Sequence, residues 1–146
     1  MTAESDLSTH FDTLGLPDDA QAWLLDLWNV IQVFDDLVDG DPVAKSAALG
    51  AVQAVFLTMP MNAFARNHLT VLQPILALQF LKWEGANRVE SAGLANEKSY
   101  VWRAGFYDVV LMVCHLCGVA DAGHAVMEMY GEPFAEYMEG QPCQAH

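Results

Sequence analysis

Basic residues are scarce in this sequence. Only 6 of its 146 residues are Lys or Arg, against 19 Asp or Glu, and the formal net charge is −13. Binding to the phosphates of nucleic acid requires a positively charged surface, so we expect no direct contact with nucleic acid. The charge is also uneven: residues 1–41 hold ten acids and no Lys or Arg, whereas residues 42–83 hold no acids.

Long apolar runs and a signal segment are also lacking. The apolar run over residues 109–120 is shorter than the ~20 residues that a membrane span needs. The acidic first residues are not followed by the apolar stretch of a secretory signal. We therefore expect a cytoplasmic protein without membrane contact.

Cysteine is rare and its count is odd. Cys114 and Cys117 lie in an apolar stretch, and Cys143 lies in the C-terminal tail. No second Cys or His pair has the spacing of a zinc site, so we expect reduced thiols rather than zinc ligands.

Strand patterns are missing too, because no Val/Ile/Thr alternation is flanked by turn residues. We predict an all-α protein: a single domain over residues 1–146, folded as a compact bundle of five to seven helices. We expect the first 18 residues to form a short helix or an arm. The other expected helices cover residues 20–39, 42–57, 63–68, 74–91, 96–117, 121–130 and a last stretch from 133.

Several residues mark where these helices begin and end. Asp18 or Asp19 is a candidate cap for the first long helix, and Gly40 is expected to end it. The pair Asp41-Pro42 predicts the next helix start, and Asn96 the start of the long apolar helix near the C-terminus.

Three acids, Asp35, Asp36 and Asp39, close the first long helix at the end where carboxylates are unfavourable. Asp35 continues an apolar stripe and Asp39 lies one turn further, so the two can point inward together. A divalent cation, Mg2+ or Mn2+, would compensate the three charges. The alternatives are ordinary cap and loop residues, or a buried salt bridge, for example to Arg103.

Two more acids interrupt apolar helix faces. Glu90 ends the stripe on residues 76–83, and Asp108 is the one acid between Gly105 and Val119. Glu90 is a candidate metal ligand or a surface acid at a helix end. Asp108 is a candidate catalytic carboxylate facing Asp35 and Asp39, or a core acid hydrogen-bonded to a Tyr, Trp or Arg.

Arg103 and Arg66 are the candidate phosphate-binding cations, with surface or salt-bridge roles as the alternative. Carboxylates that hold Mg2+ beside Arg or Lys are typical of diphosphate and triphosphate sites. Nucleophilic catalysis is not indicated, because the sequence has no Gly-x-Ser-x-Gly, no phosphate loop and no dinucleotide fingerprint.

The segment Asp35-Asp36-Leu37-Val38-Asp39 resembles the DDxxD motif of class I isoprenoid synthases. That resemblance implies an all-α fold and Mg2+ held on a diphosphate. The second metal motif of those enzymes is missing, and the chain is shorter than they are. In size and architecture the chain is closer to small all-α nucleotide pyrophosphohydrolases, which are Mg2+-dependent oligomers, although their Glu-x-x-Glu spacing is absent.

Residues 28–41, 61–64, 72–74 and 83–90 together resemble small uncharacterised helical proteins of tailed bacteriophages and prophages. This resemblance implies a phage origin, a helical fold and a location in the bacterial cytoplasm.

Three functions follow as hypotheses. The first is a metal-dependent protein acting on a phosphorylated small molecule, with Asp35, Asp39 and Asp108 as catalytic residues and a homo-oligomer as one expected state. The second is a phage accessory or virion protein that binds another protein. The third is an acidic inhibitor of a host nucleic-acid-binding protein.

Overall fold

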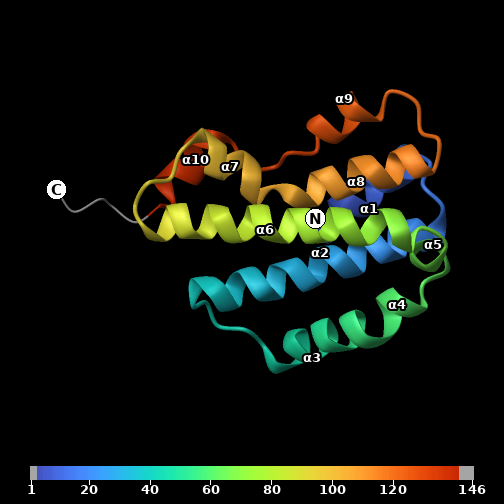
Figure 1. The fold of residues 1–146 in the computed structure, drawn as a ribbon, viewed down its shortest axis with the longest axis horizontal. Coiled ribbons are helices and arrows are strands. Elements are labelled where there is room, and N and C mark those ends of the chain that lie inside the picture. The colour runs from blue at the N-terminus through green and yellow to red at the C-terminus, as the bar shows by residue number, and fades with distance from the viewer. Residues whose placement is uncertain (1–2, 142–146) are drawn as a thin grey trace. The chain divides into compact units, whose positions relative to one another are not determined.

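The computed structural model describes residues 3–141, and these residues form helices and connecting turns without a β-strand. The all-α prediction is therefore confirmed (Figure 1). The chain divides into two compact units, residues 1–69 and 70–146. A single domain stays a prediction.

The first unit is built around one long helix, α2 (Asp18–Asp39), on which all the other helices of this unit pack. The face of α2 that is buried carries Trp23, Leu24, Leu27 and Val30. The spacing of three and four residues between them is typical of an amphipathic helix. The surrounding helices are α1 (Ala3–Thr13), α3 (Lys45–Gln53), η1 (Ala54–Thr58), α4 (Met59–Met61) and α5 (Ala63–Asn67).

The C-terminal end of α2 is where the sequence predicts it. Gly40 adopts the left-handed conformation, with φ of 79°, which a residue without Cβ reaches without strain. The N–H of Asp41 then donates a 2.8 Å hydrogen bond to the carbonyl oxygen of Asp36. The prediction for the other end is wrong. Pro17 holds the cap position, and Asp18 and Asp19 lie in the first turn, where their charges suit the helix dipole.

The next helix begins three residues later than Asp41-Pro42 predicts, at Lys45, and Ala44 precedes it without a side-chain cap. It continues through η1, a π-helical turn, to Thr58. Ala51 and Ala54 form its buried side, in one cluster with the α2 residues Val30 and Val33. Small side chains on this side let the two helices approach closely.

The second unit contains α6 (Leu69–Ser91) except its first residue, and α7 (Glu97–Arg103), α8 (Gly105–Leu116), α9 (Ala122–Met127) and α10 (Phe134–Glu139). Helix α6 begins five residues before Pro74, so this proline lies inside the helix and does not open it. After α6 the chain turns at Gly93, with φ of 70°. Helix α9 packs on α8, and α10 packs on α7.

The helix predicted over residues 96–117 is two helices. Asn96 starts the first of them with a capping box, in which its side chain accepts from Lys98 and Ser99 while Ser99 accepts from the Asn96 N–H. This start is as predicted. The break falls at Ala104, with ψ of 29°, and the following residue, Gly105, is buried against Gln79 of α6. Hydrophobic periodicity does not reveal such a turn, because both pieces are apolar.

Candidate functional site

The acids at the end of α2 are mainly on the surface. Asp36 and Asp39 are exposed and Asp35 is half-buried. The prediction that Asp35 and Asp39 point into the core together requires both side chains to be buried. Asp39 does not meet this requirement. Between residues 3 and 141, no group of three or more His, Cys, Asp or Glu side chains is placed to hold a metal ion. A metal site with Mg2+ or Mn2+ at Asp35, Asp36 and Asp39 stays a prediction.

Glu90 is held by side chains from two other helices. The Arg103 Nη1 lies 3.3 Å from both of its carboxylate oxygens, and the Tyr137 hydroxyl donates a 2.8 Å hydrogen bond to Oε1. Only 12% of the Glu90 side chain is exposed, and 22% of that of Arg103. Of the predicted site residues, the structure thus brings Glu90 and Arg103 together, as an ion pair.

Asp108 has a different partner. Its carboxylate lies 2.8 Å from the Lys82 ammonium group, which reaches it from α6. Asp108 is therefore a paired acid in an apolar helix, but it is not the core acid of the expected alternative, because 44% of its side chain is exposed and its partner is a lysine. Arg66, the other predicted phosphate-binding residue, is exposed on α5 in the first unit.

Sequence reasoning missed Tyr137. Its ring is 1% exposed, its hydroxyl lies 2.7 Å from Ser99 Oγ, and the Arg103 guanidinium lies 5.7 Å from the ring centre. Burial raises the pKa of Tyr137 to about 12, and the hydrogen bond to Glu90 acts in the same direction. The sequence does contain a signal for a buried polar contact, because the apolar stripe of α6 ends at Glu90. It does not show which hydroxyl group would reach the Glu90 carboxylate.

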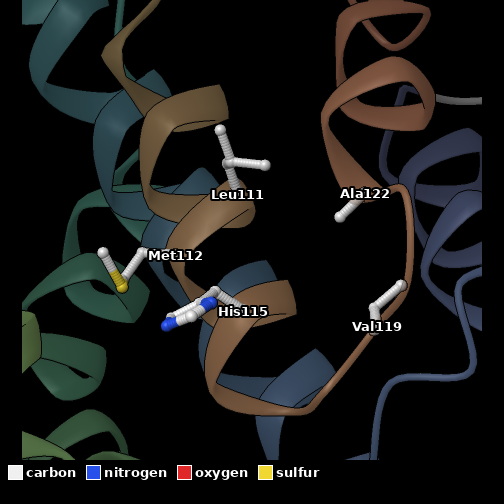
Figure 2. A pocket seen from close by; sticks show the side chains of 5 residues that line it. All are labelled: Leu111, Met112, His115, Val119 and Ala122. Carbon is white, nitrogen blue, oxygen red and sulfur yellow. The ribbon is translucent and has the colours of Figure 1, made fainter.

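A pocket of about 440 Å3 lies between α8 and α9. Figure 2 shows Leu111, Met112 and His115 projecting from α8, and Val119 and Ala122 on the segment opposite. The five lining residues include no carboxylate and no hydroxyl, so His115 has no acid or nucleophile beside it in this pocket. The lining suits an apolar group rather than a phosphate.

Cysteine chemistry is not favoured in the described part of the chain. Cys114 is buried, and this burial raises the pKa of its thiol to about 11, so little thiolate forms at neutral pH. Cys114 and Cys117 form no disulfide among the residues described. Cys143 lies outside them.

Exposed apolar side chains lie on the helix formed by α3 and η1. Leu49, Val52 and Phe56 are 59%, 55% and 73% exposed. Their spacing of three and four residues places them on one face of the helix, opposite Ala51 and Ala54. We call these three residues the outer stripe.

A second exposed apolar group lies at the end of α2. Phe34, Leu37 and Val38 are 49%, 55% and 55% exposed. They continue the helix face that Val30 and Val33 bury further back. In this group the apolar side chains alternate with the acids of the α2 end.

The chain matches no family model, no curated protein and no solved structure. The resemblances to DDxxD enzymes and to phage proteins therefore stay predictions. In residues 3–141, no helix has both the length and the apolar character to cross a membrane.

Proposed function

We propose that this protein acts by binding another protein, and that the outer stripe is its contact surface. One observation carries the proposal: Leu49, Val52 and Phe56 are more than half exposed on one helix face. Single exposed apolar residues are normal, but a group of them is typical of an interaction surface.

The core of the first unit does not account for the outer stripe. The helix of α3 and η1 already packs on α2 through its opposite side, with Ala51 and Ala54. Residues about 180° around a helix axis cannot reach the same neighbour. Burying a Leu, Val or Phe side chain stabilises by about 1.5–3 kcal/mol. A partner that covers the outer stripe would gain this free energy, because the fold leaves these side chains exposed.

The shape of the outer stripe favours a helix as the partner element. Three apolar side chains at positions i, i+3 and i+7 span about 10 Å along the axis. An amphipathic helix with apolar residues at the same spacing can pack its ridge alongside them. We therefore assign the surface to an amphipathic helix of a partner protein.

The contacts of the acids favour this function over phosphate chemistry. Glu90 is paired with Arg103 and Asp108 with Lys82, so two candidate acids and one candidate phosphate-binding cation, Arg103, already have partners of opposite charge. The metal-dependent enzyme and the acidic inhibitor stay alternative predictions.

The test uses a synthetic helical peptide of 18 residues, with Leu on one face and Gln elsewhere, labelled for fluorescence anisotropy. We expect the double variant Leu49→Ser/Phe56→Ser to raise its Kd at least tenfold, equivalent to about 1.4 kcal/mol. Met127→Ser is the control, because Met127 is also exposed, at 69%, but lies on α9. Equal affinity of both variants, or no binding by the wild type at millimolar protein, would overturn the proposal.

A further inference from the structure

We infer that Met61 is an oxidation-sensitive residue of the contact surface, and that peroxide weakens partner binding by converting its thioether to the sulfoxide. This regulation rests on the proposed function and acts at the same surface. Two observations carry it: the Met61 side chain is 70% exposed, and the helix that runs from η1 into α4 turns this side chain away from α2.

The register of this helix is fixed by two residues that face α2. The Thr58 hydroxyl donates a 2.9 Å hydrogen bond to the carboxylate of Asp26 on α2. Met59 packs against the buried cluster that contains Ala54. Met61 lies two residues after Met59, which is about 200° further around a helix. It therefore points to the side opposite α2, as its exposure shows.

The outer stripe continues toward Met61 through the π-helical turn. The hydrogen bonds of such a turn span five residues instead of four, so the exposed face moves forward by one residue beyond it. Leu57 thereby joins the face that carries Leu49 before the turn, and it is 57% exposed. Met61 follows Leu57 by four residues, the spacing of neighbours on one helix face.

Met61 lies within the reach of the partner helix that covers the outer stripe. Twelve residues separate Leu49 from Met61, which is about 18 Å along a helix axis. An 18-residue partner helix is about 27 Å long, so a partner aligned with this helix covers both residues. Its apolar face would then bury the Met61 thioether.

Peroxide oxidation changes Met61 at one atom. The sulfur lone pair attacks one oxygen of hydrogen peroxide, the O–O bond breaks as the S–O bond forms, and the other oxygen leaves as water. The sulfur is oxidised and the peroxide is reduced. The flexible apolar side chain becomes polar. Its new oxygen requires a hydrogen-bond donor when it is buried, and an apolar partner face provides none.

Two other methionines serve as internal comparisons. Met59 is half-buried in the same helix and packs toward α2, so peroxide should oxidise it more slowly than Met61. Met127 is 69% exposed, almost the same as Met61, but it belongs to α9 and not to the outer stripe. Its sulfoxide should form as readily as that of Met61 and leave partner binding unchanged.

The experiment treats the full chain with hydrogen peroxide, removes the peroxide, and measures binding of the same 18-residue Leu/Gln peptide by fluorescence anisotropy. Peptide mapping by mass spectrometry follows the sulfoxide at each methionine. The readout is the ratio of the Kd after oxidation to the Kd before it, so that any effect of a substitution on the unoxidised affinity cancels.

We expect this ratio to be about ten or more for wild type and for Met127→Leu, because a buried polar oxygen without a donor has a cost of that order. For Met61→Leu the ratio should stay near one. Methionine sulfoxide reductases that act on both sulfoxide epimers should restore the wild-type affinity.

The outcomes separate the two proposals. If the ratio for Met61→Leu equals that of wild type, or if wild type binds equally well once Met61 is oxidised, the inference is wrong, while loss of binding in Leu49→Ser/Phe56→Ser still supports the outer stripe. Oxidation of Met59 before Met61 would contradict the outward register and overturn the inference as well. If unoxidised wild type does not bind the peptide, the proposed function also fails.

Discussion

The hydroxyl of Tyr137 donates a 2.8 Å hydrogen bond to Glu90, a residue 47 positions earlier in the chain. This contact joins α10 to the end of α6, and Arg103 of α7 lies against the same carboxylate. An acid that the sequence offers as a metal ligand therefore holds three helices of the second unit together.

The strength of this contact can be measured with a double-mutant cycle. Tyr137→Phe removes the donor and leaves Ser99 and Glu90 facing a ring edge, so we expect a loss of about 1–3 kcal/mol in the free energy of unfolding. Glu90→Gln should cost a similar amount, and the two changes should couple by at least 0.5 kcal/mol. Urea unfolding of the four proteins measures both; strict additivity would show that the hydroxyl and the carboxylate do not interact.

The raised pKa of Tyr137 predicts a loss of stability at high pH. Its ordinary pKa is about 10, which applies to the unfolded chain, and in the folded protein it is about 12. Between these values the unfolded state has lost the proton that the folded state keeps, so the free energy of unfolding falls as pH rises from about 10 to about 12.

The urea midpoint of wild type, followed from pH 8 to pH 11.5, checks this expectation. Tyr107 and Tyr130 add to the same slope, because burial raises their pKa values too. Tyr137→Phe should therefore show a shallower decline than wild type, not a flat line. Parallel declines would contradict the assignment to Tyr137.

Two helical glycines should respond oppositely to alanine. A Cβ at Gly105 would lie 3.1 Å from the Cβ of Gln79 and closer still to its amide oxygen, whereas a Cβ at Gly123 meets nothing within 4 Å. We expect Gly105→Ala to destabilise the protein by about 1–3 kcal/mol through overpacking. Gly123→Ala, in α9, should stabilise it by about 0.5–1 kcal/mol.

Thermal unfolding measures the stability change of these two variants, because a change of about 1 kcal/mol shifts the Tm of a chain this size by roughly 2–6 °C. Equal shifts for both variants would mean that the contact between α6 and α8 at Gly105 is loose.

The metal site at the end of α2 remains to be tested. A ligand at 100 times its Kd adds about 2.7 kcal/mol to stability, roughly 5–10 °C in Tm. If Asp35 and Asp39 bind Mg2+ or Mn2+, wild type should melt higher with metal than with EDTA, and Asp35→Asn/Asp39→Asn should not. Glu128→Gln/Glu139→Gln is the charge-matched control and should keep the response. If the Tm of wild type responds to neither metal, the predicted metal site at the end of α2 is wrong.

The helices themselves, and several of their ends, could be predicted from the sequence. Gly40 and the Asn96 capping box act through hydrogen bonds within a few residues, so the local sequence contains what is needed to place them. The start at Asp18 was misjudged because Pro17 takes the cap position. The break at Ala104 was missed because the reason for it, Gly105 against Gln79, lies on another helix.

The partners of the candidate site residues were decided only by tertiary structure. The sequence by itself determined that Glu90, Asp108 and Arg103 are charged residues on apolar helices. It did not determine that Glu90 would meet Tyr137 and Arg103, or that Asp108 would meet Lys82. Local patterns report which face of a helix is apolar. Which face stays exposed, as at Leu49 and Phe56, depends on how many neighbours the fold packs around that helix, and only the three-dimensional packing supplies that number.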